Sequence, residues 1–353
     1  MMTGNALIER IGIRLPIIQA PMAGVSSPVM AAAVSEAGAL GSIAVGATDA
    51  DGARQMIAEV RARSGRPFNV NLFCHRPAEA DAAIEAAWIE RFRPLFAAFD
   101  AAPPPVLAEI YRSFVDDDAM LGMLLDTRPA VVSFHFGLPG AEAVRALRGA
   151  GIVLLATATN LAEAQAIAAA GIDAVVAQGW EAGGHRGMFD PDADDARMDM
   201  IALTRLLVRG TALPVVAAGG IMDGRGIAAA LEVGASAAQL GTAFIASDES
   251  LADAGYRAAL ASAAAHRTEM TRAISGRPAR SLANRFTVLG AGIPAGAVPA
   301  YPIAYDLGKA LHAAAKAKGE SGFGAQWAGQ GAPAVRAMPA ARLIETLAAE
   351  MAD

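Results

Sequence analysis

Cysteine is almost absent from this sequence, which has a single thiol, Cys74, in 353 residues. One cysteine excludes an internal disulfide and any structural zinc site that needs a second thiol. It fits a reducing compartment, so we expect a cytoplasmic protein. Cys74 follows a strand-like run and has no basic residue paired with it in sequence, and we interpret it as structural rather than nucleophilic.

Clusters of basic residues are also lacking. The 29 Lys and Arg residues are scattered among 35 Asp and Glu residues, and the net charge is −6. Because nothing here would attract a polyanionic backbone, we expect no nucleic-acid partner. The first twenty residues carry Glu9, Arg10 and Arg14 between short apolar pieces, so we expect neither a signal peptide nor a membrane span there.

Apolar residues are plentiful, at 54% of the chain with a mean hydropathy of +0.36, which predicts one domain with a large core. Eight apolar runs of strand length alternate with Ala-rich helical segments, a pattern typical of parallel α/β folds. The runs are 16–20, 40–45, 68–73, 131–136, 153–157, 174–178, 215–218 and 237–240. Eight such units predict a (β/α)8 TIM barrel.

An open doubly wound sheet is the alternative fold. Gly224, Gly226 and Ala229 have the G-x-G-x-x-A spacing of a dinucleotide site. Three residues separate this motif from the preceding Ala218-Gly219-Gly220 turn, whereas a true fingerprint follows its strand directly. The barrel therefore remains the favoured fold.

Two segments interrupt the alternation. Residues 76–129 form a long insertion, in which aromatic residues at helical spacing predict the packing face of inserted helices. These are Trp88, Phe92, Phe96 and Phe99. Residues 247–322 are helix-rich without a further strand pattern, and we predict a cap over the barrel mouth. The predicted barrel thus spans 1–246 and 323–353, with a final amphipathic helix at 336–351.

The loop after the sixth predicted strand carries the strongest active-site signal. Gly183 and Gly184 have no side chains, so they allow the backbone to approach a ligand closely. They precede His185, a candidate acid, base or hydrogen-bond donor. The alternative is that His185 only caps a loop. The nearby Gln178 and Glu181, together with the paired glycines, favour the functional interpretation.

Other strand ends add polar groups and a candidate phosphate site. Gly219 and Gly220 follow the seventh predicted strand, and Gly241 and Thr242 follow the eighth, where barrels often hold a phosphate. Two ordinary tight turns would look the same. The amides of Asn71 and Gln178 suit a flat heterocycle, so the combination suggests a flavin mononucleotide, FMN.

No metal site is predicted. Asp190, Asp192, Asp194 and Asp195 resemble a calcium loop, but Asp195 stands where an EF-hand needs glycine and Ile201 where it needs glutamate. We interpret the segment as a solvated acidic loop. The remaining histidines lack metal-ligand spacing.

Several motifs in order along the chain resemble those of the nitronate monooxygenases, also called 2-nitropropane dioxygenases, and most closely their bacterial class I branch. The resemblance covers nearly the whole chain. It rests on segments 19–24, 70–73, 132–137, 178–185, 218–221, 239–244 and 324–330, with Tyr301, Tyr305 and Lys309.

This resemblance implies non-covalent FMN and the oxidation of alkyl nitronates by O2 to a carbonyl compound plus nitrite or nitrate, with propionate 3-nitronate as the substrate. We expect a monomer or homodimer with no membrane partner. The implied FMN contacts are Met22, Asn71, Gln178, Gly183, Gly220, Gln239, Leu240, Gly241 and Thr242. The implied substrate pocket adds the catalytic His185 with Tyr301, Tyr305 and Lys309. Ser133 and His135, at the end of the fourth predicted strand, are further candidates for this pocket.

The implied chemistry agrees with these residue types, because a cationic or hydrogen-bonding His185 or Lys309 would hold an anionic nitronate. With a neutral nitroalkane, His185 would be the base. Relatives on this barrel also resemble NADH:quinone reductases and other flavin reductases, which gives the rival activity. A flavin-binding barrel without catalysis is the second rival.

Overall fold

The computed structural model describes residues 5–352, and its centre is an eight-stranded parallel sheet. The strand order is β1-β9-β8-β6-β5-β4-β3-β2, and a parallel bridge between Ile18 and Leu40 joins the two edges. The predicted TIM barrel is therefore confirmed, and the open sheet is excluded. The strands are β1 (Ile17–Gln19), β2 (Gly41–Ala44), β3 (Phe68–Phe73), β4 (Val131–His135), β5 (Val153–Ala158), β6 (Ala174–Gln178), β8 (Val215–Ala218) and β9 (Ala237–Leu240).

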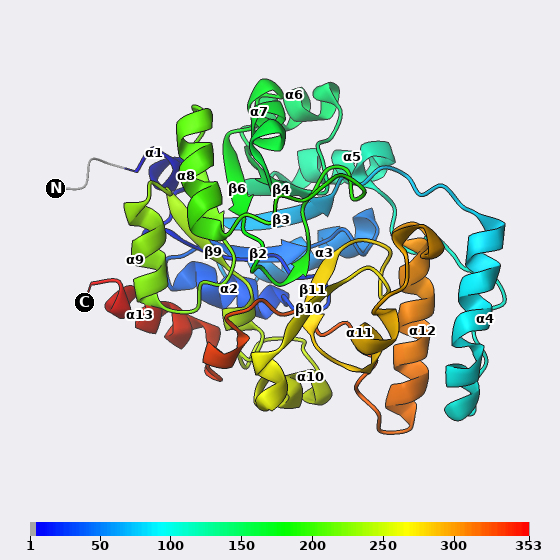
Figure 1. The fold of residues 1–353 in the computed structure, drawn as a ribbon. Helices are drawn as coiled ribbons and strands as arrows, with labels where there is room; N and C mark the ends of the chain where they lie inside the picture. The colour runs from blue at the N-terminus through cyan, green and yellow to red at the C-terminus, as the bar shows by residue number, and fades with distance from the viewer. Residues whose placement is uncertain (1–4, 353) are drawn as a thin grey trace.

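Helices surround the barrel in the alternation that the sequence predicts (Figure 1). Their starts are set locally: Asn160, for example, accepts a hydrogen bond from the Glu163 N–H at 2.9 Å and begins α7. Gly171 follows that helix at a φ of 79°. The surrounding helices are α2 (Pro28–Glu36), α3 (Ala50–Arg61), α5 (Asp118–Thr127), α6 (Ala141–Gly149), α7 (Leu161–Ala169), α8 (Met200–Gly210), α9 (Gly224–Glu232) and α13 (Ala340–Glu350).

One end of the barrel is closed by apolar side chains. Helix α1 (Ala6–Ile11) packs Leu7, Ile8 and Ile11 against strand residues such as Val131 and Leu155. Burial of these groups removes apolar surface from water and fills the N-terminal end of the barrel. The opposite end, where the strands finish, is the end left for a site.

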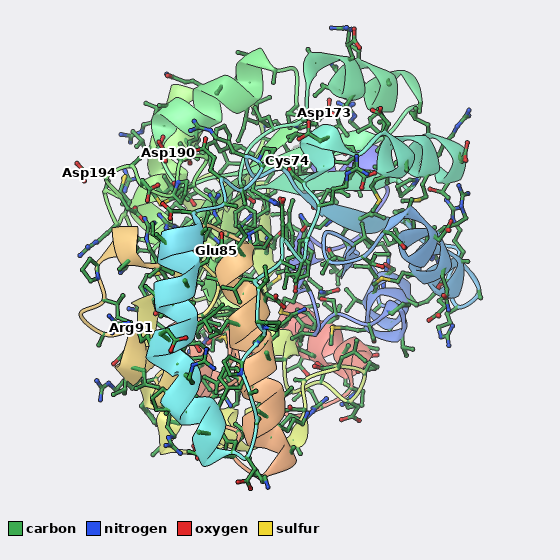
Figure 2. All side chains as sticks on the ribbon, turned by 90° about the vertical axis from the view of Figure 1, so that its right-hand side faces the viewer. Cys74, Glu85, Arg91, Asp173, Asp190 and Asp194 are labelled. Carbon is green, nitrogen blue, oxygen red and sulfur yellow. The ribbon has the colours of Figure 1, made fainter. Side chains whose placement is uncertain are left out.

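The predicted insertion divides between the barrel and the cap. Helix α5 lies against α3 and α6 of the barrel, whereas α4 (Ala82–Ala98) runs beside α12 (Ile303–Ala317) of the cap (Figure 2). Trp88, Phe92 and Phe96 are buried in that contact, so their predicted role as a packing face is confirmed.

The expectation that 247–322 adds no strand is wrong. Besides α10 (Ala254–Leu260) and α11 (Arg285–Gly290), the segment contains β10 (Thr268–Thr271) and β11 (Ala279–Leu282). They form an antiparallel sheet with β7 (Gly184–His185) in the order β10-β11-β7. Neither strand has a long apolar run, and β11 also pairs with β7, which lies far away along the chain. The sheet attaches the cap to the loop that carries His185.

Within residues 5–352, no helix is long and apolar enough to span a bilayer, and no group of three or more His, Cys, Asp or Glu side chains could hold a metal ion. Cys74 directly follows β3 and is buried, and burial raises its pKa well above the ordinary value. A thiol in that state is a poor nucleophile.

Candidate active site

A cavity of about 550 Å³ opens at the C-terminal ends of the strands and extends under the cap. Every site residue predicted from the sequence lines it, although they come from the ends of six barrel strands and from the segment 301–309 at the start of α12. This convergence follows from the barrel, because parallel strands deliver all their C-terminal ends to one face. The residues are Met22, Asn71, Ser133, His135, Gln178, Gly183, His185, Gly220, Gln239, Leu240, Gly241, Thr242, Tyr301, Tyr305 and Lys309.

His185 is held from the cap. Its Nε2 lies 2.8 Å from the Ser275 hydroxyl, and its backbone pairs with Ala279 of β11. Burial, followed by repulsion from His135, Arg277 and His75, lowers the pKa of His185 to about 3. The imidazole is therefore neutral at neutral pH, which favours the hydrogen-bonding role of His185 over the cationic one.

Two predicted site residues bind the backbone of His185. Gln178 donates from Nε2 to the His185 carbonyl at 2.9 Å, and its Oε1 accepts from the Gly187 N–H at 2.8 Å. His135 Nε2 lies 3.2 Å from the same carbonyl, and Thr157 lies 3.0 Å from its Nδ1. Burial lowers the pKa of His135 to about 4, so Nε2 donates as part of a neutral ring. The Gln178 amide thus positions the loop, and its contact with FMN stays a prediction.

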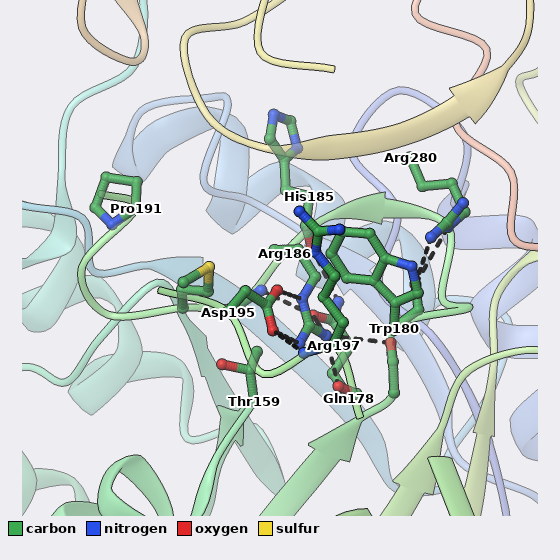
Figure 3. A network of polar contacts seen from close by, with 12 residues as sticks. Thr159, Gln178, Trp180, His185, Arg186, Pro191, Asp195, Arg197 and Arg280 are labelled. Carbon is green, nitrogen blue, oxygen red and sulfur yellow. Dashed lines mark hydrogen bonds and ion pairs between the residues drawn. The ribbon is translucent and has the colours of Figure 1, made fainter. Parts of the chain in front are cut away.

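The base of the same loop is fixed by an ion pair (Figure 3). The Arg186 side chain is 1% exposed, and it meets the Asp195 carboxylate at 2.8 Å through Nε and 3.0 Å through Nη2. Its Nη1 also donates to the Gln178 carbonyl at 2.6 Å. The prediction of a solvated acidic loop is therefore wrong for Asp195, and Asp192 pairs with Arg272 at 2.7 Å.

Trp180 packs beside this ion pair and is surrounded by guanidinium groups. Arg197 and Arg280 each lie 5.1 Å from the centre of its ring, and Arg186 lies 5.7 Å away. Such cation–π contacts are attractive. Arg280 also donates to the Trp180 carbonyl at 2.8 Å, so β11 and the β6–β7 loop are joined by side chains as well as by backbone.

The loops after β8 and β9 form the cradle that the phosphate hypothesis requires. Within residues 5–352, the backbone N–H groups of Gly220, Gly241 and Thr242 have no hydrogen-bond acceptor. A Cβ on Gly241 would meet Ala20 and Met22 at ordinary distances of 3.4 and 3.6 Å, so the protein itself does not demand glycine there. Free donors and open space facing a cavity fit an anionic group such as a phosphate.

Gly183 has a different explanation from the predicted approach to a ligand. A Cβ at this position would clash with the backbone nitrogen of Gly329 and with Ala328. The close approach is therefore between two protein segments. Its role as an FMN contact stays a prediction.

Comparison with known proteins identifies the family. The family model for nitronate monooxygenase matches residues 5–350. The chain belongs to the nitronate monooxygenase family. It is 61% identical to a nitronate monooxygenase of Paraburkholderia phytofirmans, covering 98% of this chain and 95% of that one. It is 56% identical to one from Pseudomonas aeruginosa, covering 97% of each.

Solved structures of similar fold agree with this assignment. The nitroalkane oxidase from Streptomyces ansochromogenes is 45% identical, with a TM-score of 0.89 over 98% of each chain. FabK from Thermotoga maritima is 28% identical, with a TM-score of 0.75 over 99% of this chain and 97% of that one. The first structure supports the assignment to the nitronate monooxygenase family, which is a family of oxidoreductases. The second structure has the same barrel fold.

The nitronate monooxygenase site also contains residues that sequence reasoning missed. Tyr111 from the insertion lines the cavity, and Lys309 Nζ lies 4.7 Å from the centre of its ring. Ser275 and Arg277 come from the β10–β11 connection. Tyr111 has no local pattern that marks it. The Ser275-Gly276-Arg277 segment gives only a weak indication of a turn, because a glycine between polar residues is common in turns. That pattern alone does not place these residues at the site.

Proposed function

We propose that this family member is a cytoplasmic, FMN-dependent nitronate monooxygenase, acting as a monomer or homodimer. It would oxidise alkyl nitronates, propionate 3-nitronate among them, with O2, giving a carbonyl compound plus nitrite or nitrate. The observation that carries the proposal is a single cavity combining unpaired N–H donors, a neutral histidine and a rim lysine. Family membership supports the same reaction.

FMN fits the residues present. The N–H groups of Gly220, Gly241 and Thr242 would hold its phosphate, and Asn71 and Gln239 would meet its ring system. Asn71 already donates to Ser133 Oγ at 2.9 Å, which orients its amide. Bound FMN would supply the redox chemistry that withdraws electrons from the nitronate.

The protein's own side chains would bind the anion and exclude water. Lys309 supplies a positive charge at the cavity rim, although burial lowers its pKa from the ordinary value. The rings of Tyr301 and Trp327 lie 5.4 and 5.0 Å from that of His185. These rings cover part of the imidazole, which is partly exposed to the cavity. In such a partly enclosed site its hydrogen bond to a substrate oxygen is stronger than in open water.

The state of His185 favours a nitronate over a neutral nitroalkane as substrate. A group with a pKa of about 3 is an unprotonated but weak base at neutral pH. It can donate or accept a hydrogen bond, whereas removing a proton from carbon needs a stronger base. The nitronate already lacks that proton.

An oxygen-electrode assay with purified, flavin-loaded protein tests the proposal. Rapid O2 uptake with propionate 3-nitronate, and none with NADH plus a quinone, would support it. NADH oxidation with an inert nitronate would instead support a flavin reductase, the alternative suggested by the similarity to FabK. Bound flavin with no turnover of either donor would leave a binding protein.

A further inference from the structure

Arg277 is a buried cation immediately behind the wall of the cavity. Its side chain is buried, and its guanidinium carbon lies 4.4 Å from the centre of the Phe136 ring. Phe136 lines the cavity, and its ring centre is 5.5 Å from that of His185. One aromatic ring therefore separates the positive charge from the candidate catalytic histidine.

The charge of Arg277 is not neutralised locally. Within residues 5–352 no carboxylate lies within ion-pair distance of it, because Asp192 pairs with Arg272 instead. Nη2 donates to the Met188 carbonyl, whereas the buried Nε has no partner. Burying a cation without an ion-pair partner costs desolvation free energy. Packing elsewhere in the fold has to offset this cost.

The surrounding backbone is arranged to keep this contact. Phe136 has a φ of 74°, which is rare for a bulky residue and costs conformational energy. The Arg277 carbonyl accepts from the Ser275 hydroxyl at 3.4 Å, and that hydroxyl contacts His185 Nε2. The segment that carries the charge therefore also positions the imidazole.

We propose that Arg277 is a positioning residue that supplies a fixed positive potential behind the cavity wall, in addition to the rim charge of Lys309, and favours anionic ligands in the cavity. The inference rests on the proposed function, since it takes an alkyl nitronate as the anion. His185, His135 and His75 are neutral at neutral pH, so none of them can provide that charge. Arg277 stays protonated, because burial lowers its pKa only to about 10.

The first test separates charge from packing with Arg277→Met and Arg277→Lys in the flavin-loaded protein. For propyl 1-nitronate we expect kcat/KM to fall about tenfold in the Met variant and to stay within about threefold in the Lys variant. The Kd of neutral 1-nitropropane, measured by flavin absorbance, should change by less than about twofold in both. Arg267→Met, an exposed arginine beside β10, is the control.

The second test detects the charge of Arg277 without an activity assay. It measures the pKa values of the five histidines by NMR titration in wild type and variants. Removing a neighbouring positive charge should raise the pKa of His185, by about one unit in Arg277→Met and much less in Arg277→Lys. The titratable or polar groups that face His185 are His135, His75, Arg277, Ser275, Tyr301 and Tyr305. Arg277→Gln replaces the Met variant if that protein does not fold.

The outcomes distinguish this inference from the proposed function. Equal losses for nitronate and nitropropane, or a Lys variant as damaged as the Met variant, would show a packing role and overturn it. Unchanged kcat/KM and unchanged histidine titration would overturn it as well. If wild type consumes no O2 with nitronates, the proposed function fails, and the titration still decides whether Arg277 provides the potential.

Discussion

Ser275 and His185 meet at 2.8 Å across 90 residues of sequence. The contact joins the cap to the catalytic face of the barrel, because Ser275 lies between β10 and β11 and His185 lies in β7. A neutral imidazole needs such a partner to select one tautomer and one ring orientation. The cap is therefore part of the catalytic arrangement.

Removing this hydroxyl should impair the reaction more than the fold. In Ser275→Ala we expect kcat/KM for propionate 3-nitronate to fall about tenfold, since one hydrogen bond that orients the ring is lost. Oxygen-electrode kinetics measure the loss. Ser262→Ala, at an exposed turn, is the control and should keep wild-type kcat/KM. Equal effects of the two substitutions would contradict the orienting role.

Replacing His185 should distinguish hydrogen bonding from proton abstraction. We expect His185→Asn to lower kcat/KM for nitronates by about 10- to 100-fold, because the side chain can still offer a weaker hydrogen bond. If His185 were also the base for neutral nitroalkanes, their turnover would fall much further. Parallel assays on propyl 1-nitronate and 1-nitropropane give the comparison, and equal losses would argue against the base role.

Buried neutral histidines predict a loss of stability in acid. Burial lowers the pKa values of His75 and His135 to about 4 and that of His185 to about 3, below the ordinary 6.5. At pH values between the folded-state pKa of each histidine and 6.5, the unfolded chain binds more protons than the folded one. Stability is therefore complete above pH 6.5 and falls as the pH drops, by up to about 1.4 kcal/mol per pH unit for each histidine.

Urea unfolding at several pH values checks this acid effect. His75 is the best single position to change, because neither of its buried ring nitrogens has a hydrogen-bond partner within the described residues. His75→Leu should reduce the slope of unfolding free energy against pH between 5 and 6.5. An unchanged slope would show that His75 does not contribute.

The ion pair between Arg186 and Asp195 should be strongly coupled. Arg186→Met leaves a carboxylate without its partner, and we expect a loss of about 3–5 kcal/mol in unfolding free energy. The double variant Arg186→Met with Asp195→Asn should lose less than the sum of the single variants. A double-mutant cycle by urea unfolding measures the coupling, and additive losses would contradict it.

Two glycine substitutions should have opposite consequences. Gly183→Ala places a methyl group against the Gly329 backbone, so we expect a lower Tm, equivalent to about 1–3 kcal/mol. Gly241→Ala meets only ordinary contacts within the protein, so its Tm without flavin should match wild type while its affinity for FMN falls. Thermal unfolding and flavin titration provide the two measurements. A Gly241→Ala protein with unchanged FMN affinity would contradict the cradle.

The amino-acid sequence by itself determined the barrel and the face on which its site lies. Strand and helix signals are local: eight apolar runs mark the strands, and caps such as Asn160 mark helix starts. Once the strands are parallel, polar groups at their ends must meet, which is why Asn71, Gln178 and His185 were found together.

Only the tertiary structure decided what those side chains do. The Gln178 amide is bonded to the His185 loop, and His185 is neutral because burial and nearby charges act on it. Ser275 and Arg277 reach the site through a sheet whose strands are short and lack apolar runs. Burial, charge and long-range pairing depend on residues distant in sequence, so local patterns determine where the site lies and the packed structure determines its chemistry.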